Sequence, residues 1–253
     1  MPLTETAVLD ALAPRPVRFF SQIGSTNDVA MEWLSNGASN GSVVIADEQI
    51  RGRGRLGRTW QTPPGTALIL SVILHPDAAH LPQLTMLGAL AICDLLDHLG
   101  LKHVSIKWPN DVQVNGKKIS GVLPEVSWEG SRLVGVVLGM GINVRIDFSA
   151  TELADYAINI EPLLGRPVQR LDLLKNLLAR VDYWFARLGT DELFDTWKGQ
   201  LMTLGQSVKV ESEGRVMSGI AQSVDPMGAL IVYDADGKSH RILAGDVGLG
   251  SVG

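Results

Sequence analysis

Residues 66–74 have the sequence TALILSVIL, in which only Thr66 and Ser71 are polar. A run of this kind is typical of a central strand that is buried on both faces, because neither face carries an alternating polar set. Residues 41–49 (GSVVIADEQ) precede it and predict a second strand from their β-branched side chains. Residues 83–99 follow it with the apolar spacing of a helix. A buried strand between a strand and a helix indicates an α/β domain.

The alternation of strands and helices continues on both sides of this run. Asn115–Gly116 is a good turn signal for a hairpin between two strand-like stretches. The other predicted elements are a strand over 17–24, a helix over 25–37 with Ser25 or Thr26 as its cap, strands within 104–128, a buried strand over 132–144 and helical structure over 169–201. Together they predict one α/β body.

The pattern changes at Gly205. Beyond it the chain has only short alternating runs, such as SVKVES and ALIVYD, separated by glycine and aspartate. This texture is typical of a small β-barrel. We therefore predict two domains, residues 1–203 and residues 204–253.

The composition excludes several classes of protein. With 45% apolar and 19% charged residues the chain is not disordered, and its net charge of −5 argues against a general binder of nucleic-acid backbones. The single cysteine, Cys93, excludes a disulfide framework and a thiolate zinc site, and its apolar surroundings predict a buried thiol. We find neither a signal peptide nor an apolar run as long as a membrane span. A cytoplasmic protein with no membrane partner is expected.

Positive charge is concentrated in one segment, residues 51–60 (RGRGRLGRTW). Glycine allows backbone conformations in which successive N–H groups face one anion, and arginine matches phosphate and carboxylate oxygens. Trp60 would supply an apolar flap or a stacking surface, and the alternative is a plain exposed basic turn. Because residues 51–58 have almost no apolar anchors, we expect a loop that is mobile without ligand and ordered with it.

Two further segments carry polar groups beside predicted strands. KWPND (107–111) contains a proline that restricts the residue before it, although a simple Asx-turn would also explain the segment. GKKISG (116–121) follows the hairpin turn, and strand alternation lets only one of Lys117 and Lys118 face a site.

Two more segments could contact a ligand, one through exposed backbone at glycines and the other through hydroxyl groups. GMGINV (139–144) ends a buried strand in glycines, where a ligand can approach closely. GSTND (24–28) puts two hydroxyls at a predicted helix start, where capping alone would explain them.

The succession STN, GRGRxGRxW, KWPND, GKKISG and GMGIN, closed by a small β tail, resembles that of the biotin protein ligases. The resemblance covers the chain from about Phe19 to its end, and the GRGRxGRxW and KWPND blocks together are highly specific. It implies an α/β (α+β) fold with a mixed central sheet flanked by helices, as in biotin and lipoate ligases and class II synthetases. It implies an SH3-like β-barrel for the C-terminal tail.

The resemblance implies that ATP activates biotin as biotinyl-5′-AMP, which passes to a lysine of the biotin carboxyl carrier protein of acetyl-CoA carboxylase or a related carboxylase. Biotin, ATP and Mg²⁺ are the expected ligands. Only 24 residues precede Ser25, too few for the DNA-binding domain of ligases that also repress transcription. We therefore expect a ligase-only protein that binds no DNA and is not a repressor. A homodimer and the identity of the carrier stay open.

The resemblance also assigns site residues. Lys118, with Arg53 and Arg55, is the implied catalytic group, placed as a fixed cation between the biotin carboxylate and the α-phosphate. The implied biotin contacts are Ser25, Thr26, Asn27, Gln49, Gly52, Arg53, Gly54, Arg55, Lys118, Gly121, Val122, Gly141 and Ile142. The implied ATP contacts are Arg53, Arg55, Arg58, Trp60, Lys107, Asn110, Asp111, Lys118 and Asn143. The metal would be held through the phosphates, with Asp111 as the candidate protein ligand.

Three residues depart from the family pattern: Arg51, Leu56 and Pro124, of which Pro124 predicts a bulge or an edge position in its strand. Three other functions stay open. A lipoate ligase would lack the GRGRxGRxW block, and a nucleic-acid-binding protein predicts salt-dependent binding that is independent of biotin. A catalytically silent carrier-binding protein does not explain the presence of Lys118 and Asp111.

Overall fold

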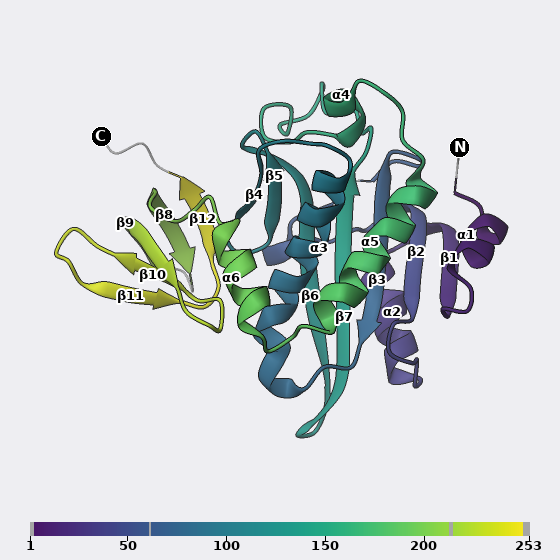
Figure 1. The fold of residues 1–253 in the computed structure, drawn as a ribbon, viewed down its shortest axis with the longest axis horizontal. Helices are drawn as coiled ribbons and strands as arrows, with labels where there is room; N and C mark the ends of the chain where they lie inside the picture. Colours follow the sequence, from purple (N-terminus) through teal and green to yellow (C-terminus); the bar gives the residue numbers. More distant parts are fainter. Residues whose placement is uncertain (1–2, 61, 213–214, 250–253) are drawn as a thin grey trace.

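The computed structural model describes residues 3–60, 62–212 and 215–249. Its larger sheet has seven strands in the order β1-β2-β3-β7-β6-β5-β4 (Figure 1). The strands are β1 (Val17–Ile23), β2 (Val43–Gln49), β3 (Ala67–Leu74), β4 (Val104–Lys107), β5 (Asp111–Val114), β6 (Lys117–Glu129) and β7 (Arg132–Asn143). β1 and β2 are parallel and the other neighbours antiparallel, so the predicted mixed sheet is confirmed.

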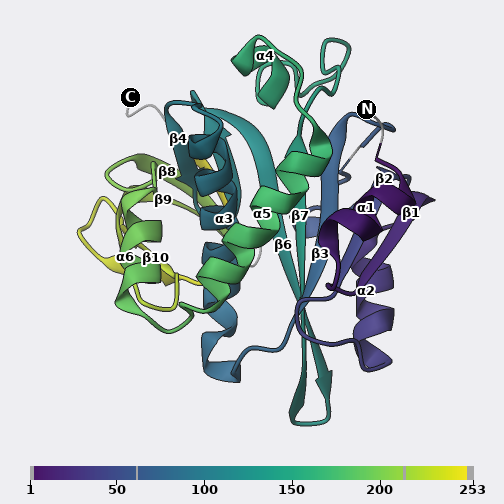
Figure 2. The same cartoon turned by 45° about the vertical axis from the view of Figure 1, so that its right-hand side comes forward.

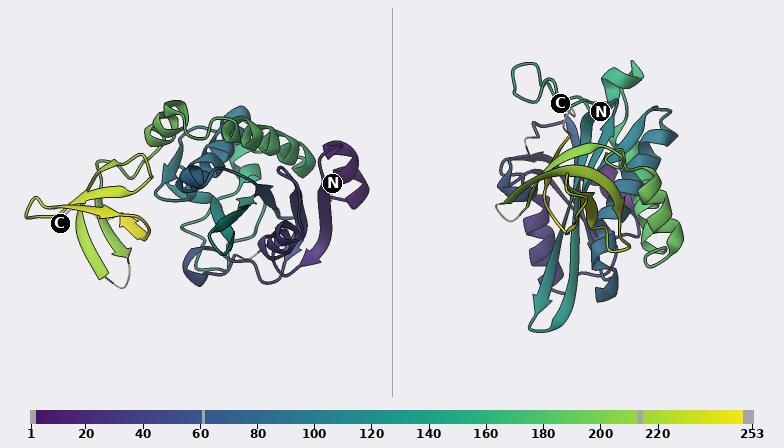
Figure 3. Two further views of the ribbon diagram at one scale, coloured as in Figure 1. Left: turned by 90° about the horizontal axis from the view of Figure 1, so that it is seen from below. Right: turned by 90° about the vertical axis from the view of Figure 1, so that its left-hand side faces the viewer.

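The predicted central strand β3 is buried along its whole length, between β2 and β7. The helices are α1 (Glu5–Leu12), α2 (Thr26–Ser35), η1 (Arg55–Gly57), η2 (Ala78–Gln83), α3 (Leu84–His98), α4 (Ile160–Leu164), α5 (Arg170–Phe185) and α6 (Asp191–Gly199). Leu70 of β3 belongs to the apolar layer that includes α3 and α5, and Ile73 packs with Leu34 of α2. Figures 2 and 3 show α3 and α5 on one face of the sheet and α2 on the other. The sheet is therefore covered on both faces.

Cys93 lies in α3, within the layer between the sheet and α5. Only 1% of the residue is exposed, which confirms the predicted buried thiol, and burial raises the pKa of that thiol. By length and composition Ala78–His98 would pass as a membrane span, which the sequence analysis did not allow for. However, 61% of its most apolar window is buried inside the structure, as in a core helix.

A second sheet of five antiparallel strands, ordered β11-β10-β9-β8-β12, stands beside the first (Figure 3). Its strands are β8 (Ser207–Ser212), β9 (Arg215–Val224), β10 (Leu230–Tyr233), β11 (Ser239–Ile242) and β12 (Asp246–Leu249). The predicted small C-terminal β domain is thereby confirmed, and its boundary near residue 204 stays a prediction.

Trp108 joins the two sheets. It is 1% exposed, its backbone N–H donates to Thr203 Oγ1 at 2.9 Å, and its indole Nε1 donates to the Gly228 carbonyl at 2.8 Å. The motif KWPND is therefore attached to the C-terminal β domain through its tryptophan.

Pro124 lies within β6, where it is paired with Leu138 of β7. Because β5 pairs with β6 only as far as Gly121, the other side of β6 has no strand beside it at Pro124 in the described sheet. The predicted edge position is confirmed, and the register shifts of β6 lie elsewhere, at Ile119 against β5 and between Ser127 and Trp128 against β7.

Candidate active site

Strand register places three of the motifs in one row across the sheet. Asp111 on β5 pairs with Gly121 on β6, and Gly121 pairs with Gly141 on β7. Directly opposite residues of antiparallel strands point to the same face. KWPND, GKKISG and GMGINV therefore meet on one face of the sheet.

The glycines of this row leave room for side chains from other segments. A Cβ built on Gly139 would lie 2.3 Å from Asn27 Oδ1, and a Cβ on Gly141 would lie 2.7 Å from Trp60 Cε2. A Cβ on Gly121 would lie 3.5 Å from Trp60 Cζ3. Because residues two apart on a strand share a face, α2 and the arginine loop (residues 51–60) both contact the same face of β7.

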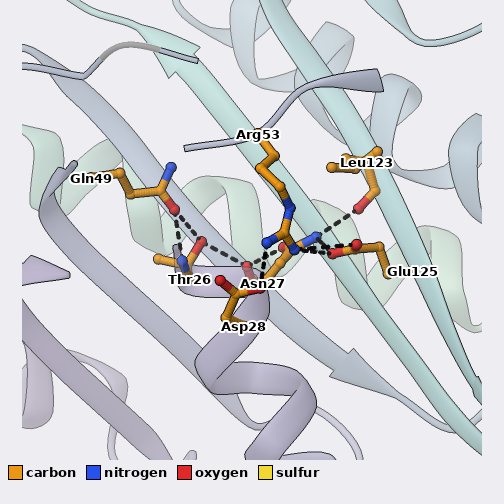
Figure 4. A network of polar contacts seen from close by, with 8 residues as sticks. Thr26, Asn27, Asp28, Gln49, Arg53, Leu123 and Glu125 are labelled. Atoms are coloured by element: carbon orange, nitrogen blue, oxygen red, sulfur yellow. Dashed lines mark hydrogen bonds and ion pairs between the residues drawn. The ribbon is translucent and has the colours of Figure 1, made fainter. Parts of the chain in front are cut away.

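Buried hydroxyl and amide groups form a network at the start of α2 (Figure 4). Gln49 Oε1 accepts from the backbone N–H of Thr26 at 2.7 Å and from its hydroxyl at 3.0 Å. Ser71 Oγ lies 2.8 Å from Thr26 Oγ1 and 2.6 Å from Asn27 Oδ1. Ser25 is at the N-cap position, but its side chain makes no capping hydrogen bond. Capping alone is therefore the wrong explanation for these hydroxyls.

Gln49 presents a donor in a fixed direction. Its Oε1 is held by Thr26, and no described residue accepts a hydrogen bond from its Nε2. A Cβ on Gly52 would lie 2.7 Å from this Nε2 and 2.4 Å from the Trp60 carbonyl oxygen, so glycine is required where the loop passes Gln49. A carbonyl group on a ligand is the acceptor that this amide suits.

Arg53 ties the arginine loop to α2 and β6. Its guanidinium lies 2.6 Å from Asp28 Oδ1 and 3.3 Å from Glu125 Oε1 (Figure 4). The hydrogen bond to Asp28 raises the pKa of Arg53 above its ordinary value. Glu125 also accepts from Asn27 Nδ2 at 2.5 Å. The loop has few apolar side chains to anchor it, and ion pairs anchor it instead. That ligand binding changes the mobility of the loop stays a prediction.

The next two arginines of the motif contact the KWPND segment and the C-terminal β domain. Arg55 Nη1 lies 3.3 Å from Asn110 Oδ1, and burial lowers the pKa of this guanidinium. Arg58 forms an ion pair with Asp246 at the start of β12. The description as a plain exposed basic turn is therefore wrong. Nothing in the structure explains Arg51 beyond its packing on Gly24.

We expect Asp246→Asn to loosen the arginine loop. Burial opposes ionisation of Asp246, but the hydrogen bond and charge of Arg58 hold its pKa below the ordinary value. The ion pair is therefore complete above the ordinary carboxylate pKa and is lost as pH falls through the lowered one. An exposed pair of this kind contributes up to about 1 kcal/mol, so amide exchange over residues 52–60 should rise by up to about fivefold. Asp236→Asn, at an exposed turn of the same domain, is the control and should leave exchange unchanged.

Lys118 lies at the end of the row. Its Nζ is 2.6 Å from Asp111 Oδ1 and 5.5 Å from the centre of the Trp60 ring. Its backbone N–H donates to the Tyr156 carbonyl at 2.7 Å, which fixes the start of β6 against the segment after β7. The structure thus brings the predicted lysine, aspartate and tryptophan together.

Two of the predicted ligand contacts have side chains on the opposite face. A Cβ on Gly88 of α3 would lie 2.6 Å from Val122 Cγ1, and Ile142 belongs to the same apolar layer. Only the backbone of Val122 and Ile142 borders the row of motifs. The orientation of the Val122 and Ile142 side chains was not predicted, because the side-chain alternation of strands was not applied to these two positions.

The predicted nucleotide contacts Asn143 and Lys107 lie at the margin of the row. Asn143 Nδ2 donates to the carbonyls of Lys118 at 3.4 Å and Ile158 at 3.2 Å, so its side chain holds backbone segments together. Lys107 on β4 pairs in register with Asp111 on β5.

Four polar residues of this site were not predicted from the sequence: Asp28, Ser71, Glu125 and Asp246. Ser71 had a signal, because it is a polar residue inside an otherwise apolar strand. Asp28, Glu125 and Asp246 had none, since their partners are arginines 25 to 188 positions away.

Comparisons with known proteins place this arrangement in a family. The model of the biotin/lipoate A/B protein ligase family matches residues 19–143, and that of the biotin protein ligase C terminal domain matches residues 203–250. The biotin–[acetyl-CoA-carboxylase] ligase of Mycobacterium tuberculosis is 33% identical, over 97% of this chain and 95% of its own length. The chain belongs to the biotin protein ligase family.

Two other relatives agree with this assignment. The bifunctional ligase/repressor BirA of Bacillus spizizenii is 31% identical, over 90% of this chain and 72% of its own length. The biotin protein ligase from Aquifex aeolicus, solved in complex with biotin and ATP, superposes with a TM-score of 0.80 at 28% identity and covers 93% of this chain. The protein is therefore an enzyme with biotin protein ligase activity, and its fold is that of the biotin protein ligases.

Proposed function

We propose that this ligase works in the cytoplasm in two steps, through biotinyl-5′-AMP. In the first step a carboxylate oxygen of biotin bonds to the α-phosphorus of ATP and pyrophosphate leaves. In the second step the amine of a lysine on the biotin carboxyl carrier protein attacks the acyl carbon, AMP leaves, and the amine loses a proton. The observation that carries the proposal is the position of the Lys118 ammonium, beside Asp111 and Trp60 at the row of motifs.

Lys118 would stabilise the adenylation transition state. Two anions, the carboxylate and the α-phosphate, must approach each other, and a fixed cation between them offsets their repulsion. Asp111 holds the ammonium in place before the substrates arrive. Arg55 is the loop arginine best placed for phosphate, because Arg53 is already paired with two carboxylates.

The network at α2 would bind the ureido ring of biotin. That ring has N–H donors and a carbonyl acceptor, so it needs both kinds of partner. Gln49 offers Nε2 as a donor, the hydroxyl of Ser25 serves as donor or acceptor, and the hydroxyl of Thr26, whose proton goes to Gln49 Oε1, serves as an acceptor. Burial of this cluster excludes water that would compete for the same groups.

Mg²⁺ would be held mainly through the nucleotide. Among the described residues no group of three histidine, cysteine or acidic side chains could hold a metal ion, and Asp111 is already paired with Lys118. One carboxylate, that of Asp111, together with the phosphates of ATP fits Mg²⁺, which usually keeps several waters and is bound through one or two carboxylates plus substrate phosphates. When bound, the ion neutralises charge on the triphosphate.

We further propose that the chain acts as a ligase without repressor activity. Support comes from the arginine loop, whose Arg53 and Arg58 are paired with carboxylates of the protein itself, and from the net charge of −5. We expect no shift of double-stranded DNA in a gel at low salt, with or without biotin. A specific, biotin-dependent shift would contradict this part of the proposal.

Incubation with biotin, ATP, Mg²⁺ and a biotin carboxyl carrier domain tests the ligase function. The mass of the carrier should increase by one biotinyl group, and pyrophosphate should be released. Lipoate in place of biotin is the matched control and should leave the carrier mass unchanged. A carrier modified by lipoate but not by biotin would overturn the proposal.

A further inference from the structure

Trp60 lies on the row of glycines, between the buried network at α2 and Lys118. Its indole lies directly on the backbone of Gly141 and Gly121, with the ring centre 5.5 Å from Lys118 Nζ. The contact is possible only because both positions lack a Cβ, since an added atom at Gly141 would come within 2.8 Å of the indole Nε1. Two cavities in the structure, of about 430 and 520 Å³, lie elsewhere.

Packing the indole in this position leaves its N–H without a hydrogen bond within the described part of the chain. Trp60 Nε1 is buried and has no hydrogen-bond partner among the described residues. Buried N–H groups nearly always have an acceptor, because leaving one unpaired forfeits its hydrogen bonds to water. The indole N–H of Trp108 has an acceptor, whereas those of Trp60 and of the core residue Trp197 have none among the described residues. Trp60 differs from Trp197 in that its ring is carried by a loop and lies on glycine backbone.

The ion pairs that hold the loop, and with it the ring, in place are weak. The Trp60 backbone N–H donates to the Gly52 carbonyl at 2.9 Å, so the ring moves with the loop. The loop is fastened by Arg53 and Arg58, whose side chains are 42% and 64% exposed. Exposed ion pairs contribute little and are screened by salt.

We propose that Trp60 occupies the acyl slot in the unliganded enzyme and leaves it when biotin binds. The inference rests on the proposed function, which puts the ureido ring at α2 and the carboxylate beside Lys118, so that the acyl chain between them passes Gly141 and Gly121. The state with the ring displaced is then a minor one, and biotin binds only that state, so the apparent association rate is reduced by its population. The loop both closes over the ligand and competes with it.

The kinetic test is the association of biotin with Trp60→Ala in stopped flow. If the open state is populated at about 10%, the variant should bind biotin about tenfold faster than the wild type, whatever happens to dissociation. Trp60→Phe, which still fills part of the slot, should lie between the two. Trp128→Ala removes a half-exposed tryptophan of the β6–β7 hairpin and should associate at the wild-type rate.

The structural test uses ¹⁹F NMR of protein labelled with 5-fluorotryptophan, in which six resonances are expected. The Trp60 resonance, assigned by its loss in Trp60→Phe, should shift on saturation with biotin, while that of Trp128 should not. An unchanged Trp60 resonance, together with equal association rates, would overturn this inference if calorimetry shows that the wild type binds biotin. Absence of biotin binding by the wild type would overturn the proposed function itself.

Discussion

Lys118→Ala should make adenylate formation slower by about two to three orders of magnitude, whereas Lys117→Ala should leave it nearly unchanged; this is the largest effect that we expect. Removing one fixed electrostatic stabiliser costs about 10²–10³ in the rate of the chemical step. Only Lys118 is in position to act, with its Nζ 2.6 Å from Asp111 and above the Trp60 ring. Neighbouring residues on a strand point to opposite faces, so Lys117 cannot replace it. Single-turnover release of pyrophosphate measures the step directly.

Two controls separate charge from folding. Lys118→Arg keeps the cation but not its shape, and should retain more activity than Lys118→Gln, which loses the charge. All three Lys118 variants should unfold close to the wild-type midpoint, because the Lys118 side chain is about one third exposed. If Lys117→Ala were the slower enzyme, or both were equally slow, the assignment of Lys118 would be wrong.

The strands and the longer helices of the body were accessible from the sequence because their signals are local, whereas the short helices α1 (Glu5–Leu12) and α4 (Ile160–Leu164) were not predicted. The apolar run at 66–74 needed no partner to be recognised as buried, and the turn at Asn115–Gly116 specified the β5–β6 hairpin, with φ of +53° and +77° at these residues. Helical structure over 169–201 was predicted as one stretch, but it divides into α5 and α6. Gly189, with φ of +81°, and the capping residue Thr190 mark that division.

The contacts of the site were less accessible, because they depend on register between distant segments. Nothing local to Gly141 shows that Trp60 packs on it, and nothing local to Arg53 shows that Asp28 and Glu125 accept its charge. The motifs identified which segments meet, through a resemblance to a known family. The direction of each side chain followed only from strand alternation and pairing, which place Gly121 on the site face and the Val122 side chain on the α3 face.

Trp108→Ala should give the largest loss of stability, about 3–5 kcal/mol, as is typical for truncation of a buried tryptophan. Trp108 is 1% exposed, and its indole donates to the Gly228 carbonyl in the C-terminal β domain. The substitution therefore leaves a cavity and an unpaired carbonyl at the contact between the two sheets. Equilibrium unfolding in urea, followed by circular dichroism, measures the loss.

Two further variants show which part of Trp108 matters. Trp108→Phe keeps most of the ring but removes the donor to Gly228, so it should cost about 1–3 kcal/mol, less than the alanine variant. Trp128→Ala, at a position that is 50% exposed, should change stability by no more than about 0.5 kcal/mol. A Trp108→Ala protein with wild-type stability would show that the two sheets are held together elsewhere.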